Sequence, residues 1–182
     1  MLEVRFHGRG GQGAVTASRI LATAFVNTGR YGASFPMFGF ERRGAPITAF
    51  GRFGDEPIRL KTQIYTPDVL VVLDHSQKDS PAVWNGLNPE GILVMNSREV
   101  IKEQKTKNLK KACYINAMGI SLEEIGIDMP NSCILGAFAA ATGIIGIDPI
   151  IAALADYFQG KKFDTNVRCV RRGYDEAKII EF

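Results

Sequence analysis

The chain has few of the residues from which metal centres and disulfides are built. It contains three cysteines, Cys113, Cys133 and Cys169, and two histidines. The cysteines are far apart, odd in number and not arranged as C-x-x-C. Because iron–sulfur and structural zinc sites need closely spaced thiolates, we expect neither a metal site nor a cluster from this chain alone. Unpaired cysteines are typical of a reducing compartment, so we expect a cytoplasmic protein.

Long apolar runs are also lacking. Glu3, Arg5 and Arg9 interrupt the only apolar stretch near the start, so we expect no signal peptide. The charge-free stretch 129–147 contains a proline, an asparagine and three glycines, and it falls short of the ~20 apolar residues that span a bilayer. We therefore expect no membrane partner. The composition, 46% hydrophobic and 23% charged over 182 residues, predicts a single globular domain over 1–182.

Negative charge is absent from a long N-terminal segment. No Asp or Glu lies between Glu3 and Glu41, although that segment holds four arginines. The net charge of +3 is too small to indicate nucleic-acid binding, and we expect no such partner. The uneven arrangement favours an anionic ligand or an acidic partner surface.

A glycine-rich loop lies inside this acid-free segment. A strand-like run over 2–6 precedes it, and a helical pattern over 12–27 follows it. Glycines let the backbone approach an anion closely, and the helix start presents unpaired N–H groups. The order strand, loop, helix therefore predicts a phosphate site. The residues expected to form it, after His7, are Gly8, Arg9, Gly10, Gly11, Gln12 and Gly13.

The glycine spacing also matches the dinucleotide fingerprint, which requires an acidic residue about 20 positions onward. The region 28–34 has no carboxylate and carries Arg30. The loop is therefore predicted to bind an anion, but not NAD. Two alternatives stay open. One is a free-standing NAD(P)-binding protein of Rossmann type, in which Arg30 meets a 2′-phosphate; the other is a structural subunit whose glycines serve only packing.

Strand-like and helix-like segments alternate along the rest of the chain. Asp148 is expected to cap one helix, with Pro149 in its first turn. We expect an α/β fold: one three-layer α/β/α domain with a mixed, mostly parallel sheet. Strands are predicted at 69–73, 91–96 and 113–116, a hairpin at 47–53 and 58–61, and helices at 131–143 and 164–178.

The segment 29–46 combines glycine and proline with aromatic residues, and we expect it to be irregular. Exposed aromatic side chains are costly unless they cover a ligand or a partner. The charged end of this segment is either a solvated turn or a clamp on a ligand or partner. The residues expected in a partner or active-site loop are Phe35, Phe38, Phe40, Glu41, Arg42 and Arg43.

His7 and His75 each follow a predicted strand, so both are expected to face the crevice at the carboxyl ends of the strands. Asp74 could orient the neighbouring His75 ring or accept hydrogen bonds from backbone N–H groups. No nucleophile–base pair, carboxylate pair or set of metal ligands stands out. We therefore predict no catalytic residue, and a chain that completes a site in a larger assembly.

Two separated segments carry a family resemblance. His7-Gly-Arg-Gly-Gly-Gln-Gly-Ala-Val-Thr-Ala17 and Phe38-Gly-Phe-Glu-Arg-Arg-Gly-Ala-Pro46 resemble the gamma subunit of 2-oxoacid:ferredoxin oxidoreductases, in the pyruvate and 2-oxoisovalerate branch. Asn131 and the segments 135–137 and 171–174 fit the later helices of that family.

The resemblance implies an enzyme complex that converts pyruvate, or another 2-oxoacid, and coenzyme A into acyl-CoA and carbon dioxide while reducing ferredoxin. It implies alpha, beta and delta subunits as partners, with ferredoxin contacted indirectly. Thiamine diphosphate, Mg²⁺ and iron–sulfur clusters would lie in the partner subunits, with no cofactor held by this chain alone. The chain would position coenzyme A and complete the subunit interface, and would be inactive in isolation.

Overall fold

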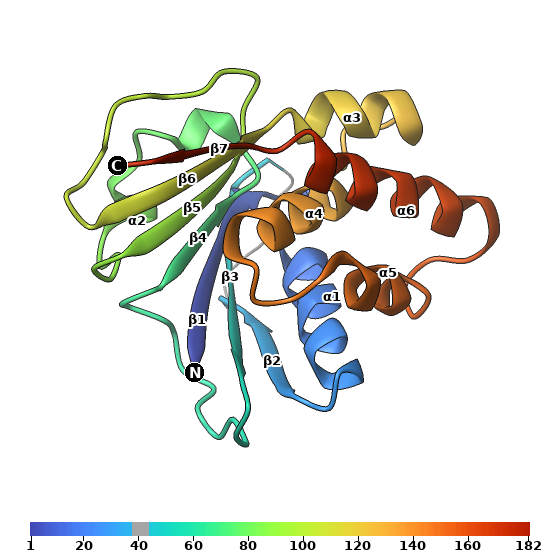
Figure 1. The fold of residues 1–182 in the computed structure, drawn as a ribbon, viewed down its shortest axis with the longest axis horizontal. Helices are drawn as coiled ribbons and strands as arrows, with labels where there is room; N and C mark the ends of the chain where they lie inside the picture. Colours follow the sequence, from blue (N-terminus) through green and yellow to red (C-terminus); the bar gives the residue numbers. More distant parts are fainter. Residues whose placement is uncertain (38–43) are drawn as a thin grey trace.

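The computed structural model describes residues 1–37 and 44–182. Within them, seven strands form one mixed sheet in the order β2-β3-β1-β4-β5-β6-β7 (Figure 1). The strands are β1 (Leu2–Arg9), β2 (Tyr31–Pro36), β3 (Pro46–Gly54), β4 (Val69–Val72), β5 (Gly91–Asn96), β6 (Leu109–Ile115) and β7 (Lys178–Glu181). The four central strands β1, β4, β5 and β6 are parallel, whereas β3 and β7 run antiparallel to their neighbours. The predicted α/β fold with a mixed sheet is confirmed.

The long helices lie together on one face of the sheet, called here the first face (Figure 1). The second face carries a short helix, α2 (Pro81–Trp84), and a 3₁₀ turn, η1 (His75–Gln77), over a smaller apolar cluster. The first-face helices are α1 (Ala14–Asn27), α3 (Ala117–Glu124), α4 (Asn131–Thr142), α5 (Ile147–Leu154) and α6 (Gly160–Asp175).

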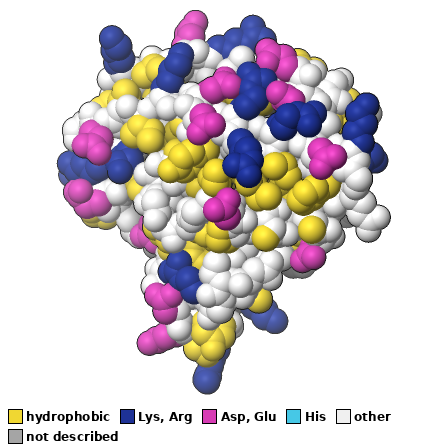
Figure 2. All heavy atoms as spheres, turned by 45° about the vertical axis from the view of Figure 1, so that its right-hand side comes forward, with side chains coloured by type: hydrophobic (Ala, Val, Ile, Leu, Met, Phe, Trp, Pro, Cys, Tyr) yellow, Lys and Arg dark blue, Asp and Glu magenta, His cyan; other side chains and the backbone are white. Residues whose placement is uncertain are grey.

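The outer surface of the first-face helices is mixed in charge. Figure 2, with this side turned forward, shows Lys and Arg interspersed with Asp and Glu around a band of apolar side chains. Arg172 on α6 pairs with Glu124 at 3.1 Å and with Glu176 at 2.6 Å, and Arg168 also reaches Glu124. Arg168 and Arg172 therefore lie on the outward side of α6. No described helix is long and apolar enough to cross a membrane.

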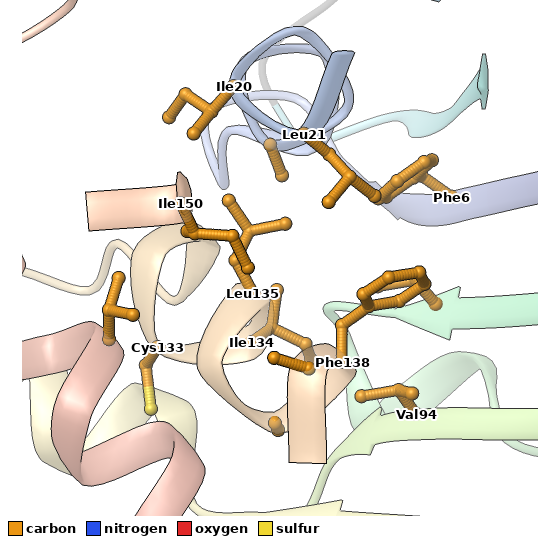
Figure 3. Packing of buried hydrophobic residues seen from close by; sticks show 14 of the residues in the cluster. Phe6, Ile20, Leu21, Val94, Cys133, Ile134, Leu135, Phe138 and Ile150 are labelled. Atoms are coloured by element: carbon orange, nitrogen blue, oxygen red, sulfur yellow. The ribbon is translucent and has the colours of Figure 1, made fainter. Parts of the chain in front are cut away.

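Helix α4 forms the centre of the first-face core, where Leu135 and Phe138 pack against Leu21, Phe6 and other apolar side chains (Figure 3). A Cβ atom on Gly136 would collide with the carbonyl oxygen of Val170 in α6. In the same way, a Cβ on Gly173 would collide with the Cys133 carbonyl oxygen. Small residues therefore let the α4 and α6 backbones touch.

The structure corrects the predicted hairpin and the predicted irregular segment. Residues 58–61 form no strand; β3 instead pairs with β1 and with β2, which lies inside the segment expected to be irregular. Gly32 explains why β2 fits there, since a Cβ at this position would lie 2.6 Å from the Ala22 carbonyl oxygen of α1. A glycine that suggested a loop thus allows close packing between strand and helix.

Two helix boundaries also differ from the predictions. Helix α5 begins two residues earlier than expected, because Gly146 is its N-cap and Asp148 lies in its first turn. Helix α6 begins at Gly160 and ends at Asp175, and Lys178 opens β7. Strand β7, which pairs with β6, was not predicted, because four residues are too few to show a clear strand pattern in the sequence.

Buried arginines organise the second face beside β1 and β3. Arg5 donates to four carbonyl oxygens, one in residue 64 and three within 82–85. Arg52 donates to the carbonyl oxygens of residues 60, 62 and 63, and its Nε lies 2.6 Å from Glu3 Oε1. Because irregular segments leave carbonyl groups unpaired, these guanidinium groups supply the partners that a strand or helix would otherwise provide.

Candidate functional site at the carboxyl ends of β1 and β4

The connections that leave β1 and β4 diverge. After β1 the chain forms α1 on the first face and reaches β2 at one edge of the sheet; after β4 it forms η1 and α2 on the second face and reaches β5 on the other side. Such a switch point is where open α/β sheets bind ligands. The glycine loop (residues 8–13) and Asp74 lie at this point.

The glycine loop has a backbone conformation that favours glycine and is held in place by hydrogen bonds. Gly11 has φ 98° and Gly13 has φ 81°, values that favour glycine. The loop also continues the pairing of β1 with the start of β3: the Gly10 N–H donates to the Ala45 carbonyl at 2.9 Å, and the Gly44 N–H donates to the Gly10 carbonyl at 3.2 Å. The residues just before β3 therefore help to position the loop.

Asp74 is the centre of a polar network around the loop. Its Oδ2 lies 3.1 Å from Arg9 Nε and accepts from Gln12 Nε2 at 3.0 Å. Its Oδ1 accepts from the Ser76 backbone N–H at 2.8 Å, so of its two predicted roles the structure shows backbone capping. The Arg9 guanidinium also donates to the Gly44 carbonyl at 3.1 Å and to Ser76 Oγ at 3.0 Å. Arg9 is therefore shared between the loop and the end of β4.

Opposing effects determine the pKa values of the carboxyl groups near the glycine loop. Burial disfavours the ionised form of Asp74, but hydrogen bonds from Ser76 and Gln12 and the charge of Arg9 outweigh it, so its pKa is lowered. The pKa of Asp128 is raised, by burial and by the negative charge of Asp74. Asp128 precedes the N-cap of α4 by two residues and is close enough to Asp74 to feel its charge, which the sequence pattern did not reveal.

Two helix N-termini meet at the loop. Gly13 is the N-cap of α1, and a Cβ there would lie 2.9 Å from Asn131 Nδ2, at the first residue of α4. Neither helix has an acidic residue in its first turn. Asn131 is buried, and its Oδ1 accepts from the Ser132 N–H at 2.9 Å. Within the described residues Nδ2 has no hydrogen-bond partner, so it remains a donor beside two positive helix ends.

The two histidines do not share a cavity, contrary to the prediction. His7 lies on the second face and lines a cavity of about 190 Å³, called here the His7 cavity. His75 lines another, of about 320 Å³, together with Asn96, Asn116 and Met118. The Nδ1 atom of His75 is buried and has no hydrogen-bond partner in the part of the chain that the structure describes.

His7 is a neutral hydrogen-bonding group. Its side chain is buried, and its Nε2 accepts from Arg5 Nε at 3.0 Å. Burial and then the charge of Arg5 lower the pKa of His7 to about 3. A neutral imidazole whose Nε2 accepts must carry its proton on Nδ1.

The predicted loop of partner-facing residues is only partly visible. Phe35 lies on β2, two strands away from β1, where its ring centre is 5.6 Å from that of Phe50 and 5.4 Å from the Arg52 guanidinium carbon. This places Phe35 in the second-face packing rather than at the glycine loop. The other predicted residues, Phe38, Phe40, Glu41, Arg42 and Arg43, lie outside the described residues.

Fold and site together define an α/β protein with a glycine loop at a topological switch point, lacking the ribose-binding acid of the NAD-binding proteins. The sequence from residue 3 to residue 176 matches the family model for pyruvate ferredoxin/flavodoxin oxidoreductase. The chain belongs to this family, and the predicted resemblance is confirmed.

Relatives and solved structures agree over the full length. The chain is 50% identical over 184 residues to the "pyruvate/ketoisovalerate oxidoreductases common subunit gamma" of Pyrococcus furiosus, covering 100% of both chains. It is 45% identical over 178 residues to "pyruvate synthase subunit PorC" of Methanothermobacter marburgensis, with 98% of each covered. The crystal structure of the pyruvate oxidoreductase subunit PORC of Thermotoga maritima superposes with a TM-score of 0.87 at 39% identity, covering 99% of this chain and 98% of that one.

Proposed function

We propose that the chain is the gamma subunit of a 2-oxoacid:ferredoxin oxidoreductase complex, with pyruvate as the principal 2-oxoacid. The full-length identity to proteins named as gamma or PorC subunits supports this. The name of the Pyrococcus relative, a subunit common to pyruvate and ketoisovalerate enzymes, supports a chain that leaves substrate choice to its partners.

The proposed complex contains alpha, beta and delta subunits and works in the cytoplasm. It oxidatively decarboxylates the 2-oxoacid with coenzyme A to acyl-CoA and carbon dioxide, and it reduces ferredoxin. Thiamine diphosphate with Mg²⁺ and the iron–sulfur clusters would reside in the partner subunits and supply the carbanion and electron-transfer chemistry. The gamma chain would position coenzyme A and complete the interface.

The observation that carries this role is the meeting of two helix N-termini at Gly13 and Asn131. Aligned peptide dipoles, free N–H groups and the Asn131 amide favour a phosphate group there, and the first turns carry no opposing carboxylate. The diphosphate of coenzyme A is the proposed occupant. Arg9 would flank it, and the ligand would compete with Asp74 for the guanidinium.

The free-standing NAD(P)-binding alternative is disfavoured by the position of Arg30. Its Nε donates to Asp55 Oδ1 at 2.7 Å, and its Nη1 donates to the Ile144 carbonyl at 3.1 Å. These contacts hold it between β3 and the start of α5, so it is not left to bind a 2′-phosphate. A purely structural subunit stays the second candidate, since the glycine loop is also tied to β3 by backbone hydrogen bonds.

The test is Arg9→Ala in the purified complex. The Michaelis constant for coenzyme A should rise by about tenfold, the loss expected for a charge-assisted contact, with a smaller change for the 2-oxoacid. Arg19→Ala is the matched control, because Arg19 is exposed on α1 beyond its first turn.

A purely structural role predicts unchanged coenzyme A kinetics in the Arg9→Ala complex. Equal rises for both substrates, with subunits lost in native mass spectrometry, would show a role in assembly instead.

A further inference from the structure

The His7 cavity lies between β1 and β3 on one side and η1 and α2 on the other. It opens on the second face of the sheet, whereas α1 lies on the first face. Its volume of about 190 Å³ is enough for one small ion. The polar residues that line it are His7, Arg9, Thr48, Ser76, Gln77 and Ser80.

The imidazole of His7 faces this cavity as a fixed donor. Arg5 Nε donates to Nε2, so the proton resides on Nδ1. Arg5 cannot turn away easily, because the rest of its guanidinium is held by carbonyl groups of α2 and the neighbouring loop. Among the described residues none accepts from Nδ1, and an anion in the cavity that His7 lines would satisfy this N–H.

Other donors converge on the same space. The Arg9 guanidinium carries five N–H groups, and three have partners in Asp74, Gly44 and Ser76, so two remain. The Ser80 side chain lies at the start of α2 but makes no capping hydrogen bond. No carboxylate is found among the described residues that line the cavity; Asp74 contacts Arg9 from outside it.

We propose that the His7 cavity binds a phosphate dianion, either free phosphate or the phosphate monoester of a larger ligand. An imidazole N–H, a guanidinium and two or more hydroxyls reach it from different elements, which suits the three or four oxygens of a tetrahedral anion better than the two of a carboxylate. This site opens on the second face, away from the diphosphate site proposed at the start of α1, and Arg9 is the residue that the two sites share.

The test uses the purified full-length chain and inorganic phosphate at constant ionic strength. Long-range ¹H–¹⁵N spectra report the Nδ1 resonance of His7 through its carbon-bound ring protons, and so its tautomer. Saturable binding should shift this resonance, and His7→Gln should weaken phosphate binding by about tenfold. The glutamine carbonyl can still accept from Arg5 Nε, so this variant removes the donor while keeping the buried partner of Arg5.

His75→Gln is the matched control, because His75 lines a different cavity, and it should leave phosphate binding unchanged. Ser80→Ala should weaken binding to a smaller extent, with the fold intact by circular dichroism. A His7 resonance that does not respond to phosphate, or equal affinities for wild type and His7→Gln, would overturn the proposal.

A second arm distinguishes the sources of the phosphate. Coenzyme A and its 3′-dephospho form are titrated against wild type and His7→Gln. If the 3′-phosphate is the natural occupant, coenzyme A binds more tightly than the dephospho form, and His7→Gln removes the difference. If both bind equally while inorganic phosphate still shifts His7, the occupant is free phosphate. Because Arg9 belongs to both proposed sites, coenzyme A kinetics in the His7→Gln complex then separate them, and these kinetics should stay unchanged.

Discussion

Arg5 and His7 point to the same face of β1 and form a buried hydrogen bond of 3.0 Å between Nε and Nε2. The pair places a permanent cation beside an imidazole that must stay neutral. The pKa of His7 falls to about 3, first through burial and then through the Arg5 charge. The unfolded chain therefore binds more protons than the folded chain between that value and the ordinary histidine pKa of about 6.5.

The contribution of His7 to the free energy of unfolding should accordingly be greatest above about pH 6.5. It should decrease as the pH falls towards 3, by up to about 1.4 kcal/mol per pH unit. Guanidinium unfolding at a series of pH values measures this. His7→Gln should flatten the dependence between pH 6.5 and 5, whereas His75→Gln should keep it. An unchanged slope in His7→Gln would show that other groups control acid stability.

Arg52 should be more important for stability than its single ion pair suggests. Arg52→Met removes the partner of Glu3 and leaves three carbonyl oxygens of the residue 60–63 segment without donors. We expect a loss of about 3 kcal/mol in the free energy of unfolding. Urea unfolding checks it, with Arg59→Met as the control, since Arg59 is exposed and should change by less than about 0.5 kcal/mol. Similar losses for both variants would contradict this role.

Gly136→Ala should separate α4 from α6. The added methyl group would meet the Val170 carbonyl oxygen, which belongs to a rigid backbone and cannot give way like a flexible side chain. We expect a loss of about 3 kcal/mol or more, or failure to fold. Gly146→Ala is the control: its nearest atom is Pro149 Cδ at 3.9 Å, so the loss should stay below about 1 kcal/mol. Thermal unfolding compares the two variants. A Gly136→Ala chain as stable as wild type would show that α4 and α6 can move apart with little loss of free energy of unfolding.

Asp74→Asn tests the network beneath the glycine loop. The amide oxygen can still accept from the Ser76 N–H, but the charge that faces Arg9 is lost. Arg9 is partly exposed, so we expect a loss of only about 1 kcal/mol at neutral pH. Because the pKa of Asp74 is lowered in the folded chain, this contribution is present above the ordinary Asp pKa and disappears as the pH falls through the folded value.

Wild type and Asp74→Asn should therefore converge in stability at low pH. Asp164→Asn, an exposed carboxylate on α6, is the control and should match wild type throughout. A difference between Asp74→Asn and wild type that persists below pH 3 would mean that shape, not charge, explains the loss.

Local signals explain which elements the sequence predicts well. Strand β5 and helix α4 are found almost as predicted, because the residues that specify them are neighbours in the sequence. Strand β5 is an uninterrupted apolar run, and α4 starts with proline and asparagine and continues with small residues. Strand β2 was missed because its glycine has meaning only against the backbone of α1. The buried state of Arg5 and Arg52 depends on carbonyl groups many residues away, and no local pattern shows it.

The same contrast holds for the site. The glycine loop is recognisable from its residues, since glycine is favoured where φ is positive, as it is at Gly11 and Gly13. The contact of Gly13 with Asn131 and the link of Asp74 to Arg9 and Gln12 come from the tertiary fold. A helix that starts at an asparagine was visible in the sequence, but only the fold shows which loop that asparagine contacts.

The two backbone hydrogen bonds of Gly10 to Gly44 and Ala45 have a consequence for sequence change. Surface loops ordinarily tolerate insertions, because their ends are free to adjust. Here the residues just before β3 are hydrogen-bonded to the glycine loop, so an added or deleted residue that displaced them would also displace the backbone of that loop. In engineering terms, changes in chain length are better made at 56–59, which lie away from the glycine loop and ahead of the carbonyl groups that Arg5 and Arg52 hold.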